Sequence, residues 1–105
     1  MGRIVIACYK PKPAREKELD QLMKTHIDRL RREGLVTDRE SIIMKSASGT
    51  VIEVFEWASK EAIESAHHNP VVQKMWREYS EVCDYESPLN IEEFQNLFSE
   101  FEPVN

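Results

Sequence analysis

The chain has 105 residues, of which 41% are hydrophobic and 31% are charged, and this is the composition of one globular domain. Its formal net charge is −5, and acidic residues flank the densest basic cluster (Arg29, Arg31 and Arg32), which argues against binding to nucleic acid. No apolar run approaches the roughly 20 residues of a membrane span, and the apolar start is too short for a signal segment. We therefore expect a cytoplasmic protein that neither crosses a membrane nor binds nucleic acid.

The first third of the chain predicts a strand followed by a helix. The segment 3–9 is rich in Ile and Val, and both of its faces are largely apolar, so both should be covered. From 14 to 33 the apolar residues recur at helical spacing, and Gly34 is placed to end the helix as its C′ residue. The helix stripe consists of Leu19, Leu22, Met23, Ile27 and Leu30.

A hairpin is predicted next, with strands at 41–46 and 50–57 joined by a short connection that contains Gly49. Alternation along the second strand places Glu53 on one face with Phe55 and Trp57. The opposite face is also mainly apolar.

Two helical pieces and a last strand follow. Ser59 caps the first piece, and the pair Asn69-Pro70 starts the second, whose apolar side includes Trp76 and Tyr79. The segment 83–86 is a short strand that ends before a proline.

The tail from 89 to 105 carries an apolar stripe after Asn90 and Glu93, which are spaced like a capping box. We predict an amphipathic helix here, added to a domain at 1–88. Its stripe consists of Ile91, Phe94, Leu97, Phe98 and Phe101.

The order strand, helix, strand, strand, helix, strand predicts an α+β protein with a ferredoxin-like βαββαβ antiparallel sheet. Right-handed crossovers place both main helices on one face of that sheet. The other face would be too apolar to meet water. Either the tail helix folds under it or a second copy of the chain covers it, and we favour the homodimer.

Four segments resemble the antibiotic biosynthesis monooxygenase superfamily, the dimeric α/β-barrel proteins. The resemblance covers about residues 3 to 87 and is carried by Val51–Trp57, Ser59–Ala62, Ala66–Val71 and Glu81–Tyr85. Members include monooxygenases that act on aromatic polyketides without a cofactor and monooxygenases that degrade haem.

The resemblance implies a pocket between sheet and helices in each subunit. Trp57 matches a pocket Trp of the polyketide enzymes, whereas Glu53 stands in place of their Asn and Trp76 in place of a basic residue. No histidine falls where the haem enzymes have their axial ligand. We expect no cofactor.

Two residues are candidates for the chemistry. His26 falls within the apolar stripe of its helix, so it should point at the sheet, either as a core histidine or as a general base. Glu53 would then lie in an apolar cavity and need a partner, and His26 could be that partner, unless Glu53 reaches the sheet rim.

The remaining candidates would shape a pocket. Trp57, Phe55, Trp76 and Tyr79 are expected to be core or pocket-wall aromatics, and His67 either overhangs the pocket mouth or is a surface residue. The cysteines are expected to be buried free thiols, and adjacent histidines do not make a metal site, so we expect no metal.

The leading hypothesis is a cofactor-independent monooxygenase acting on an aromatic or enolisable small molecule, with Glu53 and His26 as the catalytic base. The alternative is a non-catalytic dimeric module that binds a ligand or serves in stress response.

Overall fold

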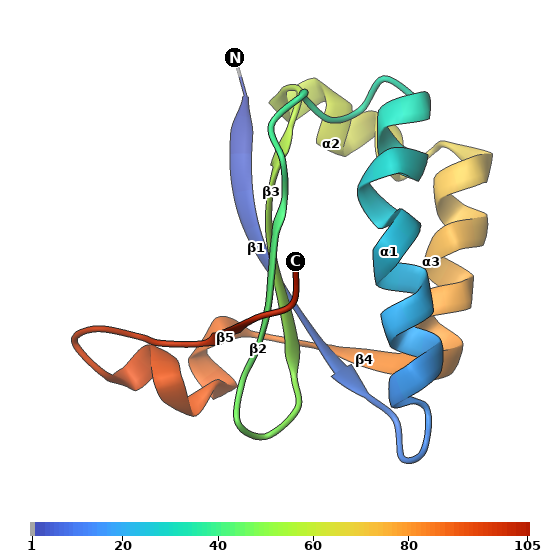
Figure 1. Cartoon of the computed structure of the whole chain (residues 1–105). Coiled ribbons are helices and arrows are strands. Elements are labelled where there is room, and N and C mark those ends of the chain that lie inside the picture. The colour runs from blue at the N-terminus through green and yellow to red at the C-terminus, as the bar shows by residue number, and fades with distance from the viewer. Residues whose placement is uncertain (1) are drawn as a thin grey trace.

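The computed structural model describes residues 2–105 and shows a five-stranded antiparallel sheet with its helices on one face (Figure 1). The sheet order is β4-β1-β3-β2-β5. Its strands are β1 (Arg3–Pro11), β2 (Ile42–Lys45), β3 (Val51–Trp57), β4 (Cys83–Glu86) and β5 (Glu102–Pro103). The helices are α1 (Glu16–Arg32), α2 (Lys60–Ala66) and α3 (Pro70–Val82). The ferredoxin-like βαββαβ fold predicted from the sequence is confirmed.

The helix ends follow from local chemistry. After α1, Gly34 has a φ of +70°, and the N–H groups of Gly34 and Leu35 donate to the carbonyls of Arg31 and Leu30. This is a Schellman ending, which glycine permits without steric strain. The Asn69 side chain accepts from the N–H groups of Val71 and Val72 and so starts α3.

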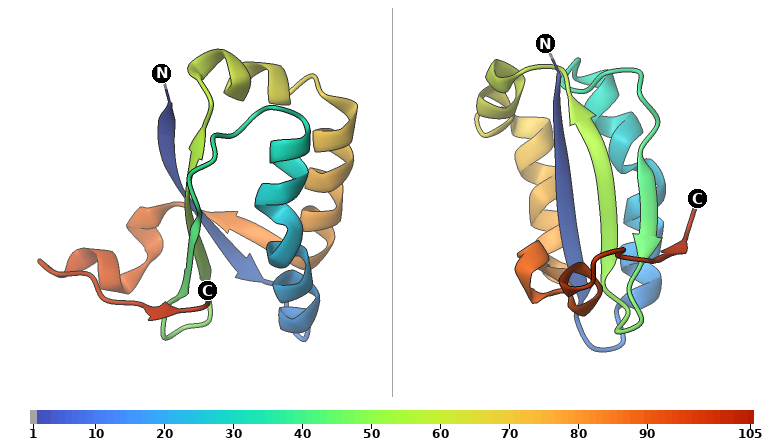
Figure 2. Two further views of the ribbon diagram at one scale, coloured as in Figure 1. Left: turned by 45° about the horizontal axis from the view of Figure 1, so that its top comes forward. Right: turned by 90° about the vertical axis from the view of Figure 1, so that its left-hand side faces the viewer.

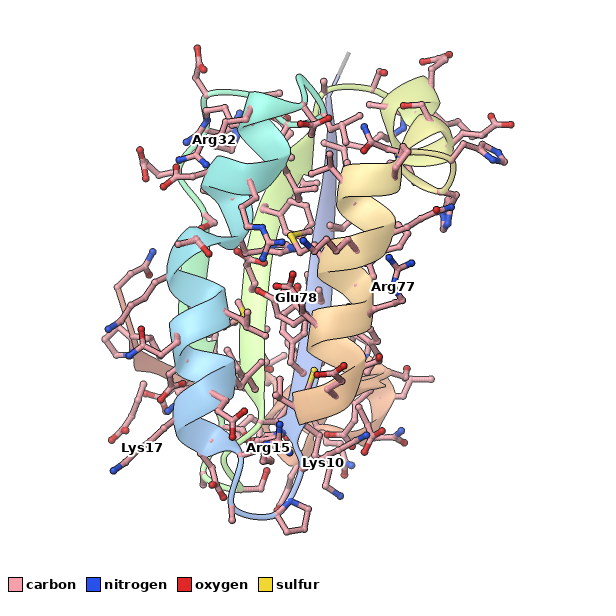
Figure 3. The ribbon with its side chains drawn as sticks, turned by 90° about the vertical axis from the view of Figure 1, so that its right-hand side faces the viewer. Lys10, Arg15, Lys17, Arg32, Arg77 and Glu78 are labelled. Atoms are coloured by element: carbon pink, nitrogen blue, oxygen red, sulfur yellow. The ribbon has the colours of Figure 1, made fainter. Side chains whose placement is uncertain are left out.

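The two main helices lie side by side over the sheet (Figure 3). Arg29 of α1 donates two hydrogen bonds, 2.9 and 3.2 Å long, to the Glu78 carboxylate of α3. This bidentate pair links the two helices. Within residues 2–105, no helix is long and apolar enough to cross a bilayer.

The register of β1 against β3 decides which side chains share a face. Ala7 lies opposite Glu53, and Val5 lies opposite Phe55. Because side chains alternate along a strand, this set and Trp57 face the helices, where Phe55 and Trp57 join the main core. The opposite face carries Ile4, Ile6, Cys8, Ile52 and Val54.

The tail differs from the amphipathic helix predicted over it. It forms two 3₁₀ turns, Pro88–Asn90 and Glu92–Gln95, and then strand β5, which pairs with β2. Val104 N–H donates to the Ile43 carbonyl at 2.8 Å, and the Asn105 side chain bonds both Ile43 N–H and the Ser41 carbonyl. An extended chain spans about twice the length of a helix per residue. The extended tail can therefore reach the edge of β2. A short helix of the same residues would be shorter, and in isolation it would be only marginally stable.

The tail covers only part of the free sheet face. Ile91, Phe94 and Phe101 pack on Cys8 and Ile52. The tail crosses one end of this face and leaves the other end open (Figure 2). The large apolar side chains that remain exposed on it are Ile4, Ile6 and Ile42, at 59%, 46% and 57%.

Candidate functional site

A cavity of about 400 Å³ opens between the sheet and the helix layer. Strand β4 pairs only with Cys8–Pro11 of β1, so the first half of β1 has no neighbouring strand on that side. Aromatic and small apolar side chains line the cavity together with two histidines. The lining residues are Val5, Ala7, Tyr9, His26, Phe55, Trp57, His67, Trp76 and Tyr85. Such a wall suits a flat, largely apolar molecule.

His26 lies at the inner end of this cavity, on the buried stripe of α1. Its side chain is almost fully enclosed, at 3% exposure for the residue. The ring meets Phe55 and Tyr79 edge to face, each with a centroid distance of 5.4 Å, and Tyr9 at 6.2 Å. Three aromatic contacts at steep angles restrict rotation of the imidazole, so its two nitrogens face fixed directions.

Glu53 lies directly against His26. It is fully buried, and its Oε1 is 2.7 Å from His26 Nδ1. That separation is typical of a charge-assisted contact, although the ring N–H does not point along the line to Oε1, so the pair does not have the angle of a good hydrogen bond. Tyr9 donates its hydroxyl proton to the same Oε1 at 3.2 Å. Among residues 2–105, Oε2 has no hydrogen-bond partner.

A buried carboxylate oxygen without a partner is unfavourable by about 1–3 kcal/mol. Sites that keep such a group are often functional. Here the arrangement places the Tyr9 hydroxyl and His26 Nδ1 at the same oxygen. Oε1 of Glu53 is therefore in polar contact, whereas Oε2 has no hydrogen-bond partner within residues 2–105.

The surrounding acids stay protonated at neutral pH. Burial, followed by the negative charge of Glu53, raises the pKa of Tyr9 well above its ordinary value. Burial is also the main cause that raises the pKa of Tyr85 to about 12 and that of Cys83 to about 11. The phenols are therefore hydrogen-bond donors, and the Cys83 thiol is a poor nucleophile.

The structure brings most of the sequence-predicted residues together. Phe55, Trp57 and Trp76 line the cavity, and His67 lies exposed at its rim, 5.2 Å from Trp76 between ring centroids. Glu53 and Tyr79 do not line it. Both lie behind His26, as contacts of the ring.

Tyr9 and Tyr85 are the functional candidates that sequence reasoning missed. They face each other across the β1–β4 ladder, with ring centroids 5.4 Å apart. Alternation from Val5 through Ala7 to Tyr9 already places Tyr9 on a single face. The register of β1 against β3, in which Ala7 pairs with Glu53, is needed to show that this face of β1 lines the cavity.

A larger groove of about 600 Å³ lies elsewhere, between α1 and the outer strands. Its wall mixes charged and apolar side chains, and Asp20 on it pairs with Lys45 at 3.3 Å. Among the residues described, none on this wall has a buried polar atom without a partner. In the part of the chain from 2 to 105, no group of three His, Cys, Asp or Glu residues is placed to hold a metal ion.

Comparison with known proteins supports the fold. No protein-family model and no curated protein matches the chain. The solved structure of Rv0793 from Mycobacterium tuberculosis is similar, with a TM-score of 0.62 and 20% sequence identity over 88% of this chain and 99% of that one. The likeness shows that the two chains share a small α/β fold.

Proposed function

We propose that this protein is a cofactor-independent monooxygenase that acts on an aromatic or enolisable small molecule, with His26 as its general base. The observation that carries the proposal is the position of His26 between a buried carboxylate and an aromatic cavity. Because Nδ1 lies against Glu53, Nε2 is the ring nitrogen left for a ligand. Glu53 acts through His26 as a positioning residue rather than as the base that touches substrate.

The reaction is written for a substrate with an acidic methylene next to an aromatic ring or carbonyl group. Nε2 takes one proton from the methylene, and Glu53 stabilises the imidazolium that forms. The carbanion adds dioxygen to give a peroxide anion, which regains a proton as the hydroperoxide. Loss of water then forms a carbonyl group, so R₂CH₂ and O₂ become R₂C=O and H₂O, and the substrate supplies all the electrons.

The test uses anthrone, a flat ketone with such a methylene, and follows oxygen uptake and product formation. His26→Gln should lower the rate at least tenfold, within the usual range for loss of a general base. His68→Gln is the matched control, because His68 is exposed and does not line the cavity. An unchanged rate in His26→Gln would exclude His26 as the base.

A second candidate function is a ligand-binding module without chemistry. It is favoured by the position of Glu53, which is paired within the protein and does not line the cavity. The same anthrone experiment separates the two. Saturable binding, seen as a rise in melting temperature without oxygen uptake, would favour the module.

We further propose that the protein acts as a homodimer in the cytoplasm. The dimer is supported by the exposed Ile4, Ile6 and Ile42 on one sheet face, an apolar surface that a second copy would cover. The cytoplasm is supported by two free, buried cysteines, which fit a reducing compartment.

A further inference from the structure

We infer that Tyr9 is a positioning residue of the proposed base: its hydroxyl holds Glu53 as a proton acceptor, so that the proton of neutral His26 stays on Nδ1 and the lone pair of Nε2 faces the cavity. This inference rests on the proposed function. It adds a residue from a different strand to the pair that the sequence suggested.

The strand register makes the contact possible. Ala7 lies opposite Glu53, and Tyr9 follows two residues later on the same face. The methyl group of Ala7 leaves room for the Tyr9 ring to lean diagonally over the carboxylate, which its hydroxyl reaches at 3.2 Å. Tyr9 is only 2% exposed and packs against Tyr79 and Tyr85, with centroid distances of 5.5 and 5.4 Å. These two contacts restrict the Tyr9 ring and so fix the direction of its hydroxyl.

The chemical role follows from what each form of Glu53 can do. A carboxylate only accepts hydrogen bonds, whereas a carboxylic acid also donates one. If Glu53 became protonated and donated to Nδ1, the single proton of neutral His26 would have to sit on Nε2. The base would then be blocked, as when a triad carboxylate is replaced by an amide.

The Tyr9 hydroxyl opposes that outcome. A hydrogen bond donated to the charged form of a carboxyl group favours the charged form. The raised pKa of Tyr9 keeps its own proton in place at any physiological pH. Because Tyr9 and His26 converge on Oε1, the phenol acts on the very oxygen that Nδ1 approaches.

Tyr79 offers the matched control. Its ring packs against His26 as closely as that of Phe55, but its hydroxyl donates to the sulfur of Met23 at 3.6 Å and not to Glu53. Tyr79→Phe therefore removes a buried hydroxyl beside His26 without touching the carboxylate.

The experiment measures the ¹⁵N chemical shifts of the His26 ring, without substrate, at a pH where the ring is neutral. We expect the Nδ1–H tautomer in the wild type and in Tyr79→Phe, and a shift of population toward Nε2–H in Tyr9→Phe. With anthrone, Tyr9→Phe should lower kcat at least tenfold and leave KM within twofold. Unchanged ring shifts in Tyr9→Phe, or equal changes in Tyr79→Phe, would overturn the inference.

A second variant of this protein provides the test if Tyr9→Phe does not fold. Incorporation of 3-fluorotyrosine at position 9 keeps the ring and strengthens the donor, so the proton should stay on Nδ1, and movement toward Nε2 would equally overturn the inference. The two proposals fail separately. Tautomer control by Tyr9 without any turnover defeats only the proposed function, whereas turnover that needs His26 with a tautomer indifferent to Tyr9 defeats only this inference.

Discussion

Glu53 is the residue whose environment departs most from what its chemistry prefers. A glutamate with 0% exposure is tolerated only when it is paired or neutralised. Here one oxygen meets His26 and Tyr9, and the other has no hydrogen-bond partner in the described part of the chain. Well-packed apolar side chains often stabilise a core as much as such a buried pair, or more.

This arrangement predicts an unusual order of stabilities. His26→Leu should lower the free energy of unfolding by about 3 kcal/mol, because it leaves a buried carboxylate without its partner. The double variant His26→Leu/Glu53→Leu should recover most of that loss, since the buried carboxyl group is removed together with its partner. Urea unfolding at pH 7 measures both differences.

The control is His68→Leu at an exposed position, which should stay within about 0.5 kcal/mol of the wild type. A double variant less stable than His26→Leu would show that Glu53 stabilises the fold without His26, and it would contradict this explanation.

At the scale of elements, the helix layer is bridged by Arg29 and Glu78. Figure 3 shows Glu78 between α1 and α3. Hydrogen bonds from Arg29 lower the pKa of Glu78 below its ordinary value. The pair holds α1, which carries His26, against α3, which carries Trp76 and Tyr79.

The pKa shift sets the sign of a pH effect. Because the folded state lowers the pKa of Glu78, its contribution to stability is present above the unfolded pKa of about 4.3 and is lost as the pH falls through the folded value. Glu78→Gln should therefore be less stable than the wild type by about 0.5–1 kcal/mol at pH 7, the range of solvent-screened pairs, and equal to it near pH 2. Urea unfolding at the two pH values measures the difference.

Glu81→Gln is the comparison for that experiment, since Glu81 is exposed at the end of the same helix and forms no ion pair within residues 2–105. The same gap at pH 7 and pH 2 in Glu78→Gln would contradict the ion-pair explanation.

On the scale of the whole molecule, the sheet is covered unequally. The helices cover most of one face, and the tail covers one end of the other (Figure 2). Leu97 and Phe98 of the tail are 92% and 81% exposed, so they do not take part in that cover. These two side chains and the apolar residues at the open end of the sheet are the exposed groups for which a second copy of the chain is the proposed partner.

The dimer proposal is tested by Ile6→Glu, which places a charge at the centre of the open sheet face. We expect the wild type to sediment as a dimer and Ile6→Glu as a folded monomer, measured by analytical ultracentrifugation and circular dichroism. Val71→Glu is the control, because Val71 is similarly exposed but lies on α3 in the helix layer. A monomeric wild type would contradict the proposal.

Local patterns in the sequence determined most of the secondary structure. Alternating strands, helical stripes, Gly34 and Asn69 are short-range signals, and a residue's own neighbours decide their outcome. The same reasoning placed His26 toward the sheet and Glu53 beside Phe55 and Trp57. It failed for the tail, where hydrogen bonds to β2 outweighed a helical stripe.

Tertiary structure alone decided the site. The contact between Glu53 and Tyr9 spans 44 residues and depends on the register of β1 against β3, which no local pattern specifies. Whether Glu53 lined the cavity or lay behind His26 was decided by its contact with His26 on α1. The sequence by itself determined which side chains were available to the cavity, and long-range packing decided which of them touch.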